Sequence, residues 1–472
     1  MNVIVSVNNN NIIGIDNDLL IHSKEDLKNF AMITKYSESD KPNMVIMGYN
    51  TWSSIPNRPL KDRVNIVITK NHITEFNNTD DLKAFVTFDN FMEWFDSNKI
   101  NYNKCFIIGG SSIYNTVFKN YIDYIELIYI TKFNHSLDYS REDIQQGSIT
   151  YFNHNLSKFK LIESTNEYSN VKLLGVDTGM EHTYLTYIHS DMYNYDEYQY
   201  LELLKDILNS DKKPTRNGDV YSKFGVRMEF DLRNGFPLLT TKQMGWKTVL
   251  RELLWFISGS TDNSELQSKK VHIWDKNADD FEERGLYEKN DLGPVYGFQW
   301  RHFGGEYINC KTPPYNGIDQ LKYIIDTIKT DPHSRRLILS SWNPVDIPNM
   351  ALPPCHVLVQ FNIEGQYIDA QLYQRSGDMF LGVPFNITSY SFLLHIIGSI
   401  TGYKPRKFVH VIGDAHIYEQ HIEAVKTQIN RIPYMFPVLE MKEITDIDNI
   451  KETDLNVVGY SSHSRISAEM VV

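Results

Sequence analysis

Five short runs rich in β-branched residues recur along roughly the first 190 residues, and they constrain the possible fold more than any other feature of the sequence. The runs are VIVSV, MVIMG, VNIVIT, CFIIGG and IELIYIT. Segments with helix-like spacing of apolar residues separate them, and this alternation is typical of a sheet with crossover helices. We therefore predict an α/β domain, with a mostly parallel central sheet and flanking helices, over residues 1–190.

The apolar pattern lapses at SDMYNYDEYQ and returns in a different form. Leu201, Leu204, Ile207 and Leu208 then recur at helical spacing. A turn at PTRNGD, an apolar helix in WKTVLRELLWFISGS and strands at RRLILSSW and CHVLVQFNI follow. Because a chain of 472 residues is too long for one ordinary core, we predict a short junction at 191–198 and a second domain over 199–472.

Charge and cysteine content argue against several classes of protein. Lys plus Arg is 47 against 59 for Asp plus Glu, and a net charge of −12 does not suit a nucleic-acid backbone as the main partner. Cys105, Cys310 and Cys355 are far apart and odd in number, which fits neither a disulfide framework nor a metal cluster. The N-terminal run MNVIVSVNNNN lacks the basic start and the small-residue cleavage site of a signal peptide, and no apolar run approaches the ~18 residues of a membrane span. We expect a cytoplasmic protein with no membrane contact and no metal.

Cys355 lies in the segment ALPPCHVLVQF, behind two prolines and at the start of an alternating apolar run. Pro353 and Pro354 fix two φ angles and remove two backbone donors, so the chain reaches the thiol in a stiff conformation. Val357, Val359 and Phe361 would share one strand face. A free cysteine near a strand is usually a small buried apolar residue, whereas a nucleophilic thiol needs positive charge close by. The residues alone leave both interpretations open.

Four arginines in short polar contexts could supply that charge. Arg216, Arg335, Arg336 and Arg375 could equally hold a phosphate dianion by paired donors, or lie on the solvated surface. Glu252, on an otherwise apolar helix, is either an exposed rim residue or a buried acid that transfers protons. Pattern alone does not decide among these roles.

Several long motifs resemble thymidylate synthase across nearly all of residues 200–472. They are LPPCH, LYQRSGDMFLGVPFN, GDAHIY, HSRRLILSSWNP, VHIWD, DLGPVYGFQWRHFG and the C-terminal MVV. The resemblance implies an α+β fold and the reductive methylation of dUMP to dTMP by 5,10-methylenetetrahydrofolate, with dihydrofolate as the second product. It also implies that Cys355 adds to C6 of dUMP and that MVV closes over the site.

The same resemblance assigns roles to individual residues. Glu252 and Tyr296 would serve proton transfer, and Trp274 and Asp378 would contact the folate. Arg335 and Arg336 would reach the phosphate from a partner subunit, which implies a homodimer, and should lie in an irregular segment after Asp331 and Pro332. The remaining dUMP contacts would be Arg216, His356, Gln374, Arg375, Ser376, Asp378, Asn386, His416 and Tyr418.

Asn386 bears on the choice of pyrimidine. A carboxamide can donate to O4 and accept from N3–H of uracil at once. A nucleotide hydroxymethylase acting on dCMP is the alternative with the same fold, and it would favour a carboxyl group at this position.

The segment CFIIGGSSIYNTVF reads as a strand, a glycine pair and the start of a helix, where bare backbone can approach a pyrophosphate. A glycine pair is more often only a turn. Further motifs, NNIIGIDNDLL, KEDLKNF, MVIMGYNTWSSI, NRPLKDRVNIVIT and IYIT, together resemble dihydrofolate reductase over residues 1 to about 188. This implies hydride transfer from NADPH to dihydrofolate.

By this second resemblance, Asp26 is the acid that binds the pterin and assists protonation, and Thr131 supports it. Arg63 would grip the glutamate carboxylate of the substrate, while Val5 and Phe30 would pack on the folate. The NADPH contacts would be Val7, Ile13, Gly48, Thr51, Thr69, Lys70, Gly109, Gly110 and Tyr114.

Two departures from the reductase pattern leave an alternative open. Leu19, Leu20 and Ile21 stand where the family usually has Leu-Pro-Trp, and Tyr49 replaces an arginine that pairs with the 2′-phosphate, so that Lys70 would have to supply the charge. The first domain could therefore be a folate-binding or scaffolding module. Against this, the second domain produces the substrate of the first, and the domain order is similar to that of the bifunctional enzymes of protozoa and plants.

Overall fold

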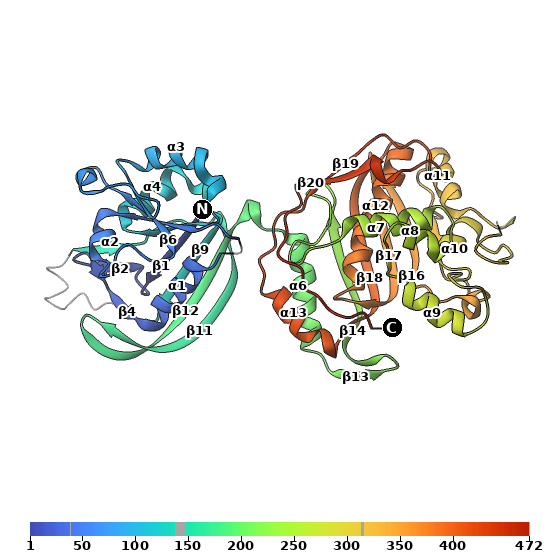
Figure 1. The fold of residues 1–472 in the computed structure, drawn as a ribbon, viewed down its shortest axis with the longest axis horizontal. Helices are drawn as coiled ribbons and strands as arrows, with labels where there is room; N and C mark the ends of the chain where they lie inside the picture. The colour runs from blue at the N-terminus through green and yellow to red at the C-terminus, as the bar shows by residue number, and fades with distance from the viewer. Residues whose placement is uncertain (38, 137–147, 313–315, 472) are drawn as a thin grey trace. The chain divides into compact units, whose positions relative to one another are not determined.

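The computed structural model describes residues 1–37, 39–136, 148–312 and 316–471. The chain divides into two compact units, Met1–Tyr193 and Asn194–Val472 (Figure 1). Helix α6 (Tyr195–Leu208) opens the second unit, so the last residues of the expected junction are already its first turn.

The first unit is built on a nine-stranded sheet in the order β4-β11-β12-β9-β1-β8-β5-β6-β7. The five β-branched runs form β1, β5, β6, β8 and β9, and these strands pair in parallel. The predicted α/β fold is thus confirmed. The strands of this sheet are β1 (Asn2–Val7), β4 (Ile21–Ser23), β5 (Asn43–Gly48), β6 (Arg63–Ile68), β7 (Leu82–Phe85), β8 (Cys105–Gly109), β9 (Leu127–Phe133), β11 (Phe159–Leu173) and β12 (Val176–His189).

Helices cover both faces of the parallel part of this sheet. Met44 and Ile46 of β5 pack in one cluster with Phe91 of α3 and Val117 of α4. Val45 and Met47 of β5 pack in another cluster with Trp52 of α2. Burial on both faces explains why these strands read as continuous apolar runs rather than alternating ones. The helices are α1 (Lys24–Lys35), α2 (Tyr49–Ser54), α3 (Phe88–Asn98) and α4 (Ser111–Asn120).

The β11–β12 hairpin was not predicted from the sequence. Its strands pair antiparallel over their whole length and turn at Leu174 and Gly175, both with positive φ; Figure 1 shows them as a long, curved pair. Most of β11 is exposed or half-buried, so its sequence lacks a clear apolar face. A small sheet of β2 (Ile12–Ile15), β3 (Asp18–Leu19) and β10 (Ile149–Tyr151) completes the strands described for this unit.

The second unit has a six-stranded sheet in the order β13-β14-β18-β17-β16-β15, which mixes antiparallel pairs with the parallel pair β17–β18. A separate two-stranded sheet joins β19 to β20. The strands are β13 (Lys212–Thr215), β14 (Gly218–Asp231), β15 (Ile338–Ser340), β16 (His356–Glu364), β17 (Tyr367–Asp378), β18 (Lys404–Tyr418), β19 (Val438–Met441) and β20 (Leu455–Val458). The other helices are α7 (Trp246–Ile257), α8 (Asn263–Ser268), α9 (Asp275–Glu283), α10 (Tyr296–His302), α11 (Gln320–Thr330), α12 (Gly382–Thr401) and α13 (Ile422–Ile429).

Helix α12 is long and apolar enough to cross a membrane if length and composition alone are considered. However, 83% of its most apolar window is buried inside the second unit, so it is a core helix. Polar residues such as Asn386 and Ser389 interrupt it, which is why the sequence shows no continuous apolar run of this length.

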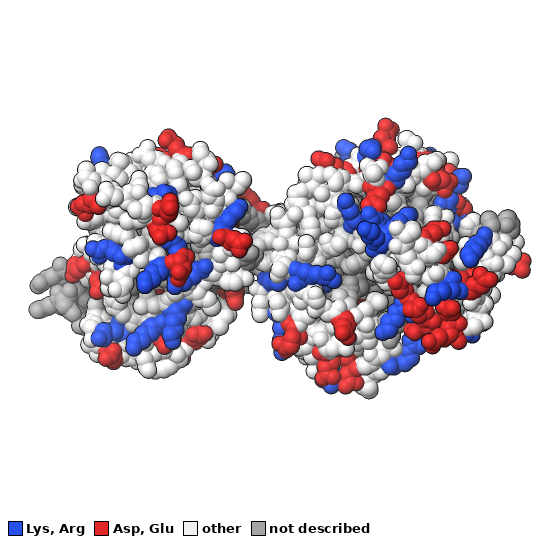
Figure 2. Space-filling view, in the orientation of Figure 1, with Lys and Arg blue, Asp and Glu red and all other residues white. Residues whose placement is uncertain are grey.

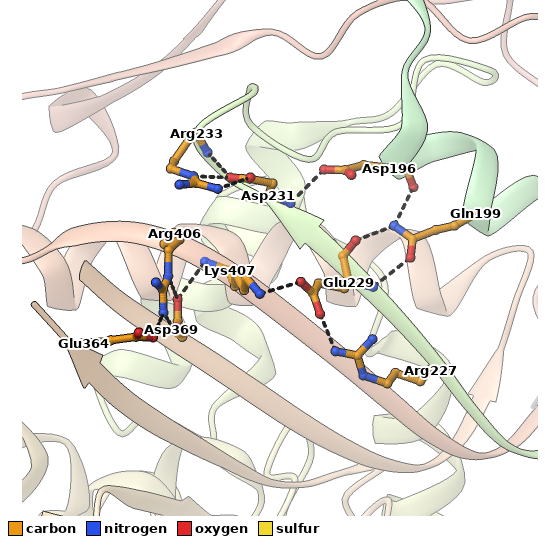
Figure 3. Close-up of polar contacts among 10 residues, drawn as sticks. All are labelled: Asp196, Gln199, Arg227, Glu229, Asp231, Arg233, Glu364, Asp369, Arg406 and Lys407. Carbon is orange, nitrogen blue, oxygen red and sulfur yellow. Dashed lines mark hydrogen bonds and ion pairs between the residues drawn. The ribbon is translucent and has the colours of Figure 1, made fainter. Parts of the chain in front are cut away.

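One face of the six-stranded sheet packs on α12, and the other, which we call the open face, is only partly covered. Phe408 and Ala370 are buried on the side of the sheet that faces the helix. On the open face, Val409 and Val411 are half-buried and Tyr373 is exposed. At one end of the open face, charged side chains pair across the strands (Figure 3). Lys407 contacts Glu229 at 2.9 Å, and Arg406 pairs with Asp369.

The expected face of β16 is only partly realised. Val359 and Phe361 are buried, but Val357 is half-buried, because the register with β17 shifts between His356 and Leu358. The irregularity lies directly after Cys355, where the strand begins.

Basic and acidic side chains are interspersed on the visible face of each unit (Figure 2). This mixed distribution differs from the continuous basic face that nucleic-acid backbones require.

Candidate active sites

Cys355 is half-buried in the turn before β16, and Arg375 of the neighbouring strand β17 holds that turn. The guanidinium donates to the carbonyl oxygens of Pro353 and Pro354 at 2.9 and 3.0 Å, and Nη2 lies 3.8 Å from Sγ of Cys355. Burial raises the pKa of the Cys355 thiol, and the positive charge of Arg375 opposes this rise. The structure therefore brings together the thiol and one of the four expected arginines.

Tyr296, at the start of α10, holds the same turn from the other side. Its hydroxyl oxygen accepts hydrogen bonds from the N–H groups of Cys355 at 2.7 Å and His356 at 3.3 Å. Burial holds the pKa of Tyr296 well above its usual value, so the phenol keeps its proton. That O–H remains a donor for a group placed beside the thiol.

Glu252 lies half-buried on α7, against the aromatic wall of this site. Nε1–H of Trp274 donates to its carboxylate at 2.8 Å, and the ring of Trp274 lies 6.2 Å from that of Tyr296. Burial raises the pKa of Glu252 to about 7, and the bond from Trp274 opposes the rise. A carboxyl with this pKa can both give and take a proton near neutral pH.

A buried polar cluster connects β16, β17 and α12. His356 and Gln374 face each other in the strand register. Burial lowers the pKa of His356 to about 4, against an opposing hydrogen bond with Asn386 of α12. The amide nitrogen of Gln374 donates to the carbonyl of Ser376 at 2.9 Å. These groups are neutral hydrogen-bonding partners, as a pyrimidine edge requires.

His410 of β18 fixes the orientation of that glutamine, although the sequence analysis did not single it out. Its Nε2 lies 2.8 Å from Oε1 of Gln374. Burial lowers the pKa of His410 to about 3, so the imidazole is neutral and Nε2 carries the hydrogen that the amide oxygen accepts.

Asp378 is the last residue of β17, shortly before α12, and lies close to two expected ribose contacts. Its carboxylate accepts from the N–H groups of Phe380 at 2.9 Å and Leu381 at 3.2 Å. It is paired with His416 in the register of β17 and β18, and the rings of His416 and Tyr418 lie 5.0 Å apart.

The C-terminal tail reaches the same end of the sheet. His421 lies 3.9 Å from Asp378, and its Nε2 lies 2.8 Å from the carbonyl oxygen of Glu469. Met470 is 45% exposed, and Val472 of the expected closing tail lies outside the described residues.

The other three arginines are exposed. Arg216 lies in the turn between β13 and β14, and its Nε donates to Asn217 at 3.0 Å. Arg335 and Arg336 lie in a turn before β15, which confirms the irregular segment expected there. All three guanidinium groups are accessible to an anionic ligand or a second subunit.

In the first unit, Asp26 lies in the first turn of α1, and each of its carboxylate oxygens has its own hydroxyl donor. Thr131 of β9 donates to Oδ1 at 2.6 Å, and Ser6 of β1 donates to Oδ2 at 2.6 Å. Burial raises the pKa of Asp26, while the bonds from Ser6 and Thr131 and the charge of His182 oppose the rise. The sequence analysis named Thr131 but not Ser6.

Helix α1 aligns the acid with two further expected residues. Phe30 follows Asp26 by one turn, and the guanidinium of Arg63 lies 5.7 Å from the centre of its ring. Arg63 is buried at the start of β6, where it donates to the hydroxyl of Thr34 at 2.6 Å. Val5 of β1 lies beside Ile130 of β9. Acid, ring and guanidinium thus follow one face of the helix.

Glycines lie where the parallel strands β5 and β8 meet the helices that follow them. Gly48 precedes α2 and Gly110 precedes α4. A Cβ on Gly110 would lie 3.2 Å from the hydroxyl oxygen of Thr51, and Gly109 has φ +122°. Bare backbone at the amino end of α4 suits a phosphate.

The other expected NADPH contacts lie around this end of the sheet. Tyr114 of α4 is buried and donates to the carbonyl of Ile4 at 2.8 Å. Thr69 is buried after β6, whereas Lys70 is exposed. Val7 and Ile13 line a small pocket together with Ile21 and Ser6.

Tyr49 is engaged by its neighbours. Its ring stacks on His72 with centroids 3.7 Å apart, and its hydroxyl donates to Glu75 at 2.8 Å. His72 Nδ1 also lies 2.6 Å from Glu75. An aromatic pair with a carboxylate therefore occupies the position where an arginine was expected.

Comparison with known proteins identifies the family of both units. Residues 198–472 match the family model of thymidylate synthase, and residues 1–177 match that of dihydrofolate reductase. The bifunctional dihydrofolate reductase-thymidylate synthase of Zea mays is 40% identical over 482 residues, which cover 95% of this chain and 92% of the maize protein. The chain belongs to the bifunctional dihydrofolate reductase-thymidylate synthase family.

Relatives from other lineages have the same two-domain organisation. The protein of that name from Plasmodium chabaudi is 38% identical, over 91% of this chain and 83% of its own. That of Paramecium tetraurelia is 35% identical, over 100% and 98%. The chain is therefore an enzyme with a reductase domain that uses NADPH and a synthase domain that uses methylenetetrahydrofolate. The family also decides against the hydroxymethylase alternative.

Ser6 and His410 are the contacting residues that sequence reasoning missed. Ser6 is the one hydroxyl in the apolar run VIVSV, and a lone polar residue in such a strand was a usable signal. His410, in KFVHVIG, gave no comparable signal, because its partner Gln374 is 36 residues away.

Proposed function

We propose that the synthase domain forms dTMP through a covalent bond between Cys355 and C6 of dUMP. Addition of the thiolate makes C5 nucleophilic, and C5 bonds to the one-carbon unit of methylenetetrahydrofolate. Loss of the C5 proton breaks the bond between the one-carbon unit and the folate nitrogen and leaves a methylene group on C5. The released tetrahydrofolate then gives a hydride to this methylene as the thiolate leaves C6, which yields dTMP and dihydrofolate. The observation that carries this proposal is the stiff turn of Cys355, held by Arg375 and Tyr296.

The surrounding residues divide the remaining work. Glu252 transfers protons to and from the pyrimidine, which its pKa of about 7 suits. Tyr296 lies near the C5 proton that must leave, and its O–H is available as a hydrogen-bond donor there. Asn386, His356 and Gln374 read the uracil edge. Arg216, Arg375 and Ser376 hold the phosphate. His416 and Tyr418 bind the ribose, and Trp274 and Asp378 contact the folate.

In the reductase domain, Asp26 binds the pterin and assists protonation of N5. When bound, NADPH supplies the hydride that C6 of dihydrofolate receives. Arg63 pairs with the glutamate carboxylate of the substrate, and Phe30 and Val5 pack on its rings. Backbone amides at Gly48, Gly109 and Gly110 bind the phosphates of NADPH. Other contacts to the cofactor come from Thr51, Thr69, Lys70 and Tyr114, which lie around these phosphates. Val7 and Ile13 lie near the nicotinamide.

The chain acts as a homodimer through the open face of the synthase sheet. Tyr373 is 37% exposed there and Val409 and Val411 are half-buried, and such apolar exposure is what a subunit interface covers. In Figure 3, four carboxylates, those of Glu229, Asp231, Glu364 and Asp369, each contact an arginine or a lysine, so burial of this end of the face would leave these four charges paired. Arg335 and Arg336 of each subunit would reach the phosphate bound to the other. Three free cysteines support a cytoplasmic location.

NADPH consumption tests both domains in one assay. Purified protein receives dUMP, formaldehyde, NADPH and a trace of tetrahydrofolate. If both domains act as proposed, NADPH consumption and dTMP will rise together to many equivalents of the folate supplied. Arrest at about one dTMP per folate would refute catalysis by the reductase domain.

Cys355→Ser separates the two halves of the proposal. The variant should form no dTMP but should reduce added dihydrofolate at the wild-type rate. Retained dTMP formation would refute the nucleophile, and the unchanged reductase rate controls for folding.

A further inference from the structure

Ser6 and Thr131 form a matched pair of hydroxyl groups. They lie opposite each other in the parallel register of β1 and β9, so both side chains project to the same side of the sheet, toward the first turn of α1. Ser6 Oγ lies 2.6 Å from Oδ2 of Asp26, and Thr131 Oγ1 lies 2.6 Å from Oδ1. Both distances are typical of a hydroxyl donating to an ionised carboxylate.

We propose that Ser6 is a positioning residue of the reductase reaction, whose hydroxyl holds the second oxygen of Asp26 and favours the ionised form of that carboxyl. The inference rests on the proposed role of Asp26. A serine has one O–H hydrogen, and here the carboxylate accepts it. Each carboxylate oxygen has further lone pairs, so Oδ2 can still accept a hydrogen bond from a pterin.

Several groups around Asp26 act on its protonation. Burial favours the neutral acid and raises the pKa, while Ser6 makes the largest opposing contribution, ahead of Thr131 and His182. Tyr184 of β12 and Glu25 of α1 also lie within electrostatic range of this cluster. Since Thr131 is retained in every variant below, changes at Ser6 report on the second oxygen alone.

The location of Ser6 separates it from a purely structural serine. It lines the same small pocket as Val7, Ile13 and Ile21, which include two of the proposed NADPH contacts. Ser6 therefore lies between the acid and the proposed nicotinamide site, where protonation and hydride transfer must be coordinated.

The test is the pH dependence of NADPH-dependent dihydrofolate reduction by the full chain. In Ser6→Ala, Asp26 loses a donor that favours ionisation, so the carboxyl should keep its proton to higher pH. The pH at which the rate begins to fall should therefore be higher than in the wild type. From about pH 6 to about pH 9, the ratio of variant to wild-type rate should rise ~3-fold or more. Ser6→Thr keeps the hydroxyl and should restore the wild-type profile. dTMP formation by the same preparations should stay unchanged.

The proposal would be overturned if Ser6→Ala lowered the rate by the same factor at every pH and left the pH at which the rate falls unchanged. If the alanine variant does not fold, Ser6→Cys provides a weak donor of similar size, and its profile should be displaced in the same direction. Failure of the underlying role is distinguishable, because Asp26→Asn would then leave reduction unchanged at every pH.

Discussion

At the scale of single residues, the two proposed acids, Asp26 and Glu252, share one property: their surroundings oppose ionisation. Burial raises the pKa of Asp26 and of Glu252, yet each carboxyl keeps at least one donor that stabilises its charged form. This balance leaves both groups able to hold a proton and to release it, which general acid–base catalysis requires.

Glu252→Gln tests that balance in the synthase domain. In the folded protein the pKa of Glu252 is about 7, above its ordinary value. As pH rises, the unfolded state therefore loses its proton first, and wild-type stability falls between the unfolded and the folded pKa. Glutamine does not ionise, so the stability of the variant does not fall for this reason. We expect the free energy of unfolding of the variant, relative to wild type, to increase by about 1–3 kcal/mol between about pH 5 and pH 8, while dTMP formation falls ~100-fold or more.

Urea unfolding at each pH measures the stability difference. Glu265→Gln, at an exposed position on the neighbouring α8, is the control and should show no such dependence. A difference for Glu252→Gln that does not change with pH would contradict the raised pKa.

Asp26→Asn tests the acid of the reductase domain. Asparagine keeps the size of the side chain but cannot supply a proton, so reduction should slow most at neutral and higher pH, where solvent protons are scarce. Initial rates of NADPH oxidation from about pH 5 to pH 9 measure this loss. Glu25→Gln, on the same helical turn, should change the profile little, and an equal effect of both variants would argue against a specific role for Asp26.

At the scale of secondary-structure elements, the junction between β8 and α4 depends on backbone that carries no side chain. Gly109 adopts φ +122°, and a Cβ there would lie 3.3 Å from the Tyr114 hydroxyl oxygen. A side chain would strain the strand end and crowd the approach to the amino end of α4. The element, rather than any one functional group, is proposed to bind the phosphates.

Gly109→Ala should therefore weaken NADPH binding by ~10-fold or more and leave dTMP formation unchanged. Gly175→Ala is a matched control, because Gly175 also has positive φ, at +84°, but has no atom within 4 Å of the added Cβ. Fluorescence titration with NADPH compares the two variants. Similar losses of affinity in both would attribute the effect to general backbone strain.

At the scale of the whole molecule, each domain has its own core, while the proposed synthase site needs two chains. The large apolar cluster of the synthase domain contains no residue of the reductase domain. Dihydrofolate made by one domain is the substrate of the other, so a variant in one domain leaves an internal control in its neighbour.

Mixed dimers test whether arginines act between subunits. Cys355→Ser and the double variant Arg335→Ala/Arg336→Ala should each be inactive in dTMP formation. The two variants are then denatured and refolded together. In a mixed dimer, one site has an intact Cys355 and receives intact arginines from its partner. Because half of the chains form mixed dimers and each mixed dimer has one working site of two, we expect about a quarter of wild-type activity. Activity no higher than that of the separate variants would show that the arginines serve their own subunit.

The sequence by itself determined the parallel strands of the reductase domain and the family of each domain. Strands buried on both faces leave an apolar run that is visible locally, and motifs such as LPPCH and KEDLKNF mark their domains without any tertiary contact. The exposed β11–β12 hairpin left no such run and was missed.

Only the tertiary structure decided which groups touch. Arg375 reaches Cys355 because β16 and β17 pair, and Thr131 reaches Asp26 across 105 residues because β1 and β9 stand side by side over α1. Ser6 and His410 acquire their roles in the same way. The raised pKa of Glu252 likewise depends on burial, a property of the packed domain. Local patterns record which face of an element is buried, whereas distances between remote side chains are set by how the elements pair and pack.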